Sequence, residues 1–229
     1  MSSTDSRSLR KLLGLPPGNP PMFQEVDIGT WSRKATYEFF REFEDPFFNV
    51  TANLDVTELY RFCKDNALSF SLAALFFSLQ AANEIRELRL RMVDDAVVEF
   101  NRVEATQTIL NDDETFSFCY FPIQDDVFEF DRSGKIAREK YKALRTFDVE
   151  AHRVDLIYYS VIPWISFTSF KHASRQNNRQ TVPRMVFGKV FEEGHKRKMP
   201  FSVEVHHALV DGLHVGKFYS LFQAKLDSV

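Results

Sequence analysis

The segment from residue 203 to 214 carries the densest potential chemistry in the sequence. It holds three of the six histidines, His206, His207 and His214, together with Asp211. An alternating apolar stretch leads into the segment, and a helical pattern starts directly after it. This order predicts that the two adjacent histidines stand at the end of a strand, where a rigid element can hold a side chain for catalysis.

Three interpretations of these residues compete. A metal site would use His206, His207, Asp211 and His214, but adjacent strand residues point to opposite faces, so the two neighbouring histidines do not easily share one metal ion. The second interpretation is structural, with histidines that cap backbone groups at the strand end. The third is a general base, because the near-neutral pKa of imidazole lets it take up and return a proton at working pH.

The elements around this segment are predicted from hydrophobic periodicity and from turn and cap residues. A helix is expected from Trp31 to about Phe43 with Thr30 as its cap, and a closing helix from Asp211 or Gly212 to about Leu226. The other expectations are strands at 26–28, 47–56, 88–92, 97–103, 106–110, 115–121, 155–170, 184–192 and 199–207, helices at 57–66 and from 71, an exposed helical stretch at 124–146 and a loop at 171–181. Together they predict one α+β domain with a largely antiparallel or mixed sheet and helices packed against it.

Composition limits the classes of function. The chain has 229 residues, a net charge of -3 and 24 phenylalanines. The charge provides no strong basic field, which argues against nucleic acid as a partner. The longest clearly apolar run, residues 72–77, is far shorter than the roughly 20 residues that span a bilayer. Cys63 and Cys119 form no disulfide or metal motif, and this suits a reducing cytoplasm. A soluble cytoplasmic protein is expected.

Five stretches resemble one known family in order and spacing. They are VDIGTWSRKATYEFF (26–40), IRELRLRMVDD (85–95), ETFSF (114–118), PWISFTSF (163–170) and MPFSVEVHHALVDGLHVGKF (199–218). The last contains the pattern His-His-x-x-x-Asp-Gly. The sequence is similar to the chloramphenicol acetyltransferase family over about residues 26–226 and, more distantly, to the catalytic domains of dihydrolipoyl acyltransferases.

The resemblance implies a role for each matching residue. His207, the second histidine of the pair, would be the base that takes a proton from an acceptor hydroxyl, so that the oxygen attacks the thioester of acetyl-CoA directly. Ser169 would donate a hydrogen bond to the oxyanion. Asp211 and Arg33 would form a pair that orients the catalytic loop.

The resemblance also suggests where the ligands bind and how the domain is organised. Phe40 and Phe118 would line the acceptor pocket, and Lys189 would lie near coenzyme A; no metal or bound prosthetic group is expected. The implied fold is an α+β two-layer sandwich with a mixed sheet and helices on one side, assembled as a homotrimer with active sites between subunits. Residues 1–23 would be a proline-rich leader, and 24–229 a single acyltransferase domain.

The sequence departs from the family where the acceptor binds. Residues 171–180 are polar where the family is apolar, Val186 stands at the position of a family threonine, and Pro46 at that of a small pocket residue. The resemblance implies O-acetylation of a chloramphenicol-type hydroxyl, with antibiotic resistance as the role. Because of these departures, two alternatives stay open. One is an acyltransferase for a different, more polar acceptor. The other is a non-catalytic binding module, which the presence of the base, the serine and the ion pair disfavours.

Overall fold

The computed structural model describes residues 22–144, 147, 153–173 and 180–229. Its main sheet has the strand order β2-β10-β8-β7-β5-β6, with β9 paired to β10. β5 to β7 and β7 to β8 run parallel and the other pairs antiparallel, so the sheet is mixed, as predicted. The strands are β2 (Phe47–Asp55), β5 (Glu104–Leu110), β6 (Phe116–Phe121), β7 (Leu156–Val161), β8 (Arg184–Phe187), β9 (Phe191–Glu193) and β10 (Lys196–His206).

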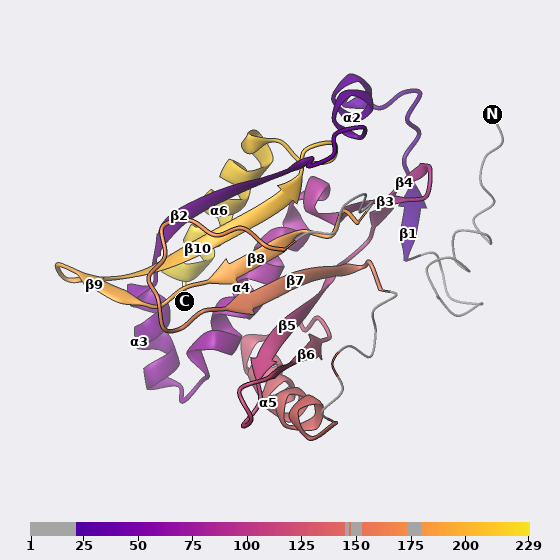
Figure 1. Cartoon of the computed structure of the whole chain (residues 1–229). Helices are drawn as coiled ribbons and strands as arrows, with labels where there is room; N and C mark the ends of the chain where they lie inside the picture. The colour runs from indigo at the N-terminus through magenta and orange to yellow at the C-terminus, as the bar shows by residue number, and fades with distance from the viewer. Residues whose placement is uncertain (1–21, 145–146, 148–152, 174–179) are drawn as a thin grey trace.

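Four helices cover one face of this sheet, which gives the two-layer α+β architecture (Figure 1). They are α3 (Thr57–Asp65), α4 (Phe70–Glu84), α5 (Val127–Leu144) and α6 (Gly212–Asp227). α4 is apolar on most of its faces because it is enclosed by α3, α5 and α6, and nine of its residues are buried. The alternate residues Phe201, Val203 and Val205 of β10 point into the same core, where the Phe201 ring packs on Phe218 and Phe222 of α6.

A second, three-stranded sheet lies beside the main one. Its order is β1-β4-β3, formed by β1 (Phe23–Glu25), β4 (Ala96–Phe100) and β3 (Leu90–Val93), with a 3-10 turn at Arg86–Arg89 before β3. Arg91 of β3 is fully buried and donates hydrogen bonds to four backbone carbonyls, those of Val154, Leu88, Leu90 and Leu156. This one side chain therefore ties the small sheet to the start of β7.

Several predicted boundaries were wrong. The helix predicted from Trp31 is α2 (Lys34–Phe40), and Thr30 bonds back to Asp27 instead of capping it. The strand predicted over 155–170 ends at Val161, because the chain then leaves the sheet and residues 162–173 cross its open face. The turn at Gly194, with a φ of 61°, joins β9 to β10 as predicted, and both β8 and β9 pair antiparallel with β10, but residues 188–190 divide the strand predicted over 184–192 into two. The proposed leader lies almost wholly outside the described residues, although Phe23 already belongs to β1.

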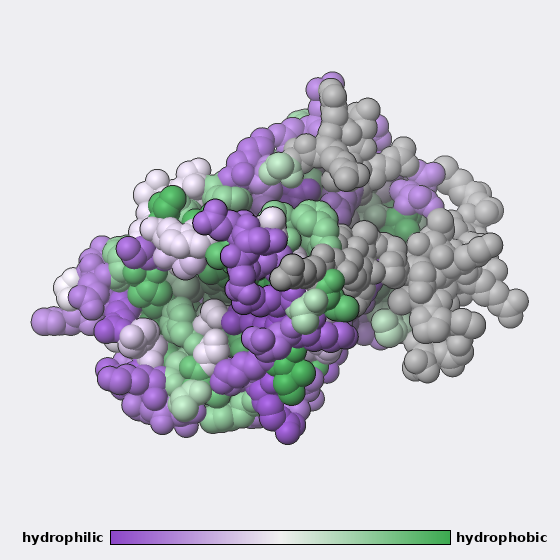
Figure 2. Space-filling model, turned by 60° about the horizontal axis from the view of Figure 1, so that its bottom comes forward, coloured by the Kyte–Doolittle hydropathy of each residue, from purple (hydrophilic) through white to green (hydrophobic). Residues whose placement is uncertain are grey.

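The described helices include none that is long and apolar enough to cross a membrane. On the face shown in Figure 2, hydrophobic side chains are interleaved with hydrophilic ones.

Candidate active site

His207 follows the last residue of β10 and is held there by the edge strand β2. His206 pairs with Phe47 in the ladder, and the backbone N–H of His207 donates to the carbonyl of Pro46 at 2.9 Å. The next turn closes tightly, since the N–H groups of Leu209 and Val210 both donate to the carbonyl of His206. The backbone around His207 is thus fixed from both sides, while a third of its side chain stays exposed.

Two phenylalanine rings enclose the imidazole of His207. The Phe40 ring from α2 stacks on it with 3.9 Å between centroids and 5° between planes, and Phe48 of β2 lies at 4.8 Å. α2 is held against the protein by Trp31, which precedes it, and by Tyr37; both rings are buried and contact one another. Phe40, predicted to line the acceptor pocket, therefore lies directly against His207, and Phe48 is a neighbour that no sequence motif indicated.

The pair of Asp211 and Arg33 holds the loop that follows His207. Arg33 donates to both carboxylate oxygens of Asp211 and, through Nη2, to the carbonyl of His207 at 3.3 Å. The second oxygen of the carboxylate, Oδ1, lies 3.3 Å from Nδ1 of His207, although the two are not aligned as a hydrogen bond. Because Nδ1 faces the carboxylate, Nε2 is the nitrogen available for proton transfer.

The charge of Asp211 is stabilised in the same arrangement. Burial by itself would raise the pKa of this carboxyl, but hydrogen bonds and charge from Arg33 outweigh burial and lower the pKa. Asp211 also precedes α6, where its backbone N–H donates to Nδ1 of His214 at 2.9 Å. Nε2 of His214 lies 3.5 Å from Glu87. The spacing Asp-x-x-His at a helix start is that of a capping box and is the signal in the sequence that indicates this role for His214.

His206 occupies the opposite face of β10 from the helical core and is buried. Its Nδ1 accepts a hydrogen bond from the N–H of Ala208 at 3.2 Å, and its ring meets the Phe47 ring edge-on at 5.2 Å. Burial, with a contribution from the charge of His207, lowers the pKa of His206 to about 4. His206 is therefore a neutral, structural residue at working pH.

This lowered pKa predicts acid destabilisation. Between the unfolded-state pKa of about 6.5 and the folded-state value of about 4, the unfolded chain binds the extra proton, so stability falls as the pH falls through that window. The loss from this group is on the order of 3 kcal/mol at most. Urea unfolding at pH 7 and pH 5 measures it, and His206→Gln should flatten the difference. An equal difference in the variant would assign the effect to other groups.

Ser169 lies in the segment that crosses the open face of the sheet. The segment is attached near its start, where the N–H of Lys189 donates to the carbonyl of Ile165 and the Ser166 hydroxyl donates to the carbonyl of Lys189. It is attached again at His172, whose N–H donates to Glu204. Ser169 itself is exposed, and its hydroxyl makes no hydrogen bond to any residue that the structure describes.

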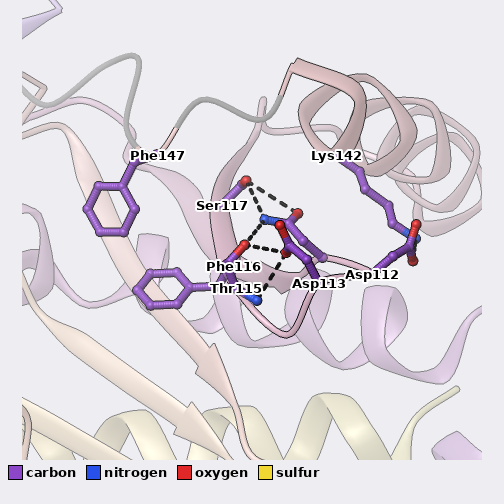
Figure 3. Close-up of a pocket in the computed structure, with 8 residues that line it drawn as sticks. Asp112, Asp113, Thr115, Phe116, Ser117, Lys142 and Phe147 are labelled. Carbon is purple, nitrogen blue, oxygen red and sulfur yellow. Dashed lines mark hydrogen bonds and ion pairs between the residues drawn. The ribbon is translucent and has the colours of Figure 1, made fainter.

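Phe118 lies in a separate aromatic cluster at the far edge of the sheet. Its ring contacts those of Phe116 and Phe147 at 5.9 and 5.3 Å. The latter two rings also flank a cavity of about 230 Å³, whose polar wall is formed by the turn between β5 and β6 and by Lys142, paired with Asp112 (Figure 3). β6 and α2 lie at opposite ends of the molecule (Figure 1), so Phe118 and Phe40 do not meet within one chain.

Lys189 follows β8 at the end of the sheet remote from His207. β8 and β10 are antiparallel, and the N–H of Gly188 donates to the carbonyl of Pro200, seven residues before His207. The lysine side chain is exposed. At about 3.4 Å per residue, the seven residues from Pro200 to His207 place Lys189 about 24 Å from His207 along β10.

The comparison with protein families shows which family the chain belongs to. The model of the chloramphenicol acetyltransferase family matches residues 22–223, which include Arg33, Ser169, His207 and Asp211. The chain belongs to this family. It is therefore an acetyltransferase, and members of the chloramphenicol acetyltransferase family use acetyl-CoA as co-substrate.

Individual chloramphenicol acetyltransferases agree with the family assignment. Chloramphenicol acetyltransferase 3 of Escherichia coli is 28% identical over 208 residues, which cover 90% of this chain and 98% of that protein. The enzyme of Proteus mirabilis is 29% identical over 203 residues, 88% of this chain and 94% of its own length. A solved chloramphenicol acetyltransferase superposes with a TM-score of 0.78 at 27% identity, covering 90% of this chain and all of the other.

More distant structures share the fold. A probable dihydrolipoamide acetyltransferase from Listeria monocytogenes gives a TM-score of 0.59 at 14% identity, covering 92% of this chain and 94% of the other. The predicted fold class is thus confirmed. Among the described residues of this family member, no group of three or more histidine, cysteine, aspartate or glutamate side chains is arranged to hold a metal ion.

Proposed function

We propose that the chain transfers the acetyl group of acetyl-CoA to a hydroxyl of a chloramphenicol-type small molecule, with His207 as general base and antibiotic resistance as the biological role. The observation that carries this proposal is the state of His207: its ring is fixed by Phe40, its Nδ1 faces Asp211, and a third of it remains exposed. A fixed imidazole whose other nitrogen is free is the arrangement that general-base catalysis requires.

The proposed reaction has a single tetrahedral intermediate. Nε2 of His207 removes the proton from the acceptor hydroxyl as its oxygen bonds to the thioester carbonyl carbon. The carbonyl π electrons move to oxygen, and the Ser169 hydroxyl donates a hydrogen bond to that oxyanion. When the oxyanion collapses, the carbon–sulfur bond breaks, and the thiolate of coenzyme A takes the proton from the imidazolium. The products are the acetyl ester and free coenzyme A.

We further propose that Asp211 and Arg33 serve this reaction by fixing the loop after His207. Asp211→Asn should lower kcat at least tenfold and destabilise the fold by about 2 kcal/mol, because charged hydrogen bonds are lost at a partly exposed pair. The stabilisation from the lowered pKa of Asp211 is present above about pH 3.9 and is lost as the pH falls through its folded-state pKa. Chemical unfolding and steady-state kinetics measure both effects. Equal kcat in the variant and the parent would contradict the role.

A homotrimer with the site between subunits is the assembly that we propose. β6 and β10 are separated by β8, β7 and β5, hence by about 19 Å at a spacing of about 4.8 Å per strand. Phe118 is thus too far from His207 to share a small acceptor in one chain. Exposed phenylalanines surround both places, Phe39 and Phe43 near His207 and Phe116 and Phe147 near Phe118. Contact between these clusters in neighbouring subunits would cover both and complete one pocket.

Lys189 is proposed to bind the phosphate end of coenzyme A. Its exposed ammonium group lies at the end of the sheet remote from His207. Coenzyme A is a long molecule with its phosphates far from its thioester, so a cation remote from the base fits its charge distribution.

A more polar acceptor is the second candidate. It is favoured by the charged residues of the crossing segment, where Lys171 pairs with Asp45 at 2.6 Å. Asp45 precedes Pro46, whose carbonyl accepts the N–H of His207. Release of free thiol from acetyl-CoA, measured with chloramphenicol and with a panel of amines, lipoyl thiols and other alcohols, distinguishes the two. Rapid release with chloramphenicol supports the first candidate. Release only with a polar acceptor supports the second, and none with any acceptor overturns both.

A further inference from the structure

A buried ion pair lies on the open face of the sheet, between β8 and the part of β10 that leads into the loop of His207. Oε1 of Glu204 on β10 accepts a hydrogen bond from Nη1 of Arg184 on β8 at 2.7 Å. The two side chains are only 2% and 6% exposed. A buried carboxylate and guanidinium are costly to desolvate, and apolar residues of similar size would often serve stability equally well. The pair is therefore weak evidence for stability and calls for another role.

The other oxygen of Glu204 holds the segment that carries Ser169. Oε2 accepts the backbone N–H of His172 at 3.1 Å, three residues after the serine. Burial alone would raise the pKa of Glu204, but His172 and Arg184 lower it to about 2, so the carboxylate is charged at neutral pH. A charged acceptor makes the contact with the N–H of His172 a strong one.

Ser169 has no hydrogen bond of its own among the described residues, so its position depends on the attachments of its segment, of which the contact of His172 with Glu204 is buried and that of Lys171 with Asp45 is exposed. At the near end, the Phe167 ring lies against Gly188 so closely that a Cβ at Gly188 would sit 3.0 Å from it. At the far end stands Glu204. Without Glu204, the four residues between Phe167 and His172 would be held at this end only by the exposed pair of Lys171 with Asp45.

The same pair also contacts the strand end that bears the base. The guanidinium of Arg184 lies over the Phe47 ring at 4.5 Å, and the edge of that ring also contacts the His206 ring. Pro46, next to Phe47, accepts the N–H of His207. The segment of Ser169 and the loop of His207 are therefore positioned from one shared pair of charged side chains.

We propose that Glu204 is a positioning residue for the acetyl transfer, which holds the hydroxyl of Ser169 in place for the oxyanion through its contact with His172. This inference rests on the proposed function, because it requires Ser169 to act as the oxyanion donor. It differs from that function in assigning the placement of the donor to a residue outside the histidine motif.

Glu204→Gln is the direct test. The amide keeps the size of the side chain but has only one acceptor oxygen, so it cannot accept from both Arg184 and His172. We expect kcat to fall about 10- to 100-fold, the loss typical of a misplaced catalytic group, with the KM for acetyl-CoA unchanged. In a Ser169→Ala background the same substitution should change kcat less than about twofold, because residues that act through one group are not additive.

Two further variants keep the test decisive. Glu99→Gln disrupts another buried glutamate with arginine partners, Arg86 and Arg89, in the small sheet, and should leave kcat unchanged. If Glu204→Gln does not fold, Glu204→Asp keeps the charge on a side chain one methylene shorter, which cannot hold Arg184 and His172 in the same positions, and should show the same loss of kcat and the same dependence on Ser169.

The possible results distinguish the positioning role of Glu204 from the oxyanion role of Ser169. A kcat that is unchanged in the Glu204 variant, or a loss that multiplies with that of Ser169→Ala, overturns the positioning role and leaves the proposed function standing. A Ser169→Ala variant with the kcat of the parent overturns the oxyanion role, and the inference falls with it.

Discussion

Replacing His207 by alanine is expected to lower kcat by about 10²- to 10⁴-fold, the range over which general bases contribute. The KM for acetyl-CoA should change little, because the variant removes the proton acceptor and leaves the remote end of the site intact. Thiol release under saturating chloramphenicol, or under the acceptor that the panel identifies, gives the rate.

His195→Ala is the matched control for this variant. His195 is exposed beside the turn between β9 and β10, at the opposite end of β10 from His207. The control should keep the parent kcat and stability. A His207→Ala enzyme with more than half of the parent kcat would exclude the histidine as the base and turn attention to another proton acceptor.

The second large effect is expected for Ser169→Ala, with a loss in kcat of about 10²- to 10³-fold, typical of a missing oxyanion donor. Ser169 is exposed and its hydroxyl has no bond to the described part of the chain, so the variant should have the stability of the parent. A lower kcat with an unchanged free energy of unfolding would therefore indicate that Ser169 makes its hydrogen bond only when the oxyanion forms.

Thr168→Val is the neighbouring control. It removes a hydroxyl from the same exposed segment one residue away, and we expect kcat within about twofold of the parent, since surface substitutions away from special features have small effects. Equal losses in both variants would indicate that the whole segment has shifted, and the oxyanion role would not follow from the result.

The strand end and the helix start around His207 were predictable from local pattern. Alternation along β10 and the Asp-Gly pair before α6 indicated that the histidines lie at a rigid junction, and the structure has that junction at His206 and Gly212. The boundaries that failed are those where a tertiary contact overrides local preference. Residues 162–170 were predicted as part of a strand, yet they cross the sheet because Phe167 packs against Gly188 and His172, two residues beyond them, is bonded to Glu204 of β10.

The types and order of the candidate catalytic residues were accessible from the sequence alone, because the motif of adjacent histidines and the four other stretches carried the family resemblance. Their mutual positions were decided only by the tertiary structure. Arg33 and Asp211, 178 residues apart, meet because α2 packs beside the end of β10. Phe118 and Phe40, predicted for one pocket, stand at opposite ends of the sheet because strand order separates β6 from β10.

Glu204 is a residue whose partners could not be predicted from the sequence. In the sequence it is one charged residue in an apolar strand, and nothing near it predicts a partner. Its partners, Arg184 and His172, come from a neighbouring strand and a crossing segment, and folding buries Glu204 with Arg184 while His172 stays partly exposed beside them. Local sequence determines which residues line a strand, but long-range pairing determines which charges are neutralised and what they hold in place.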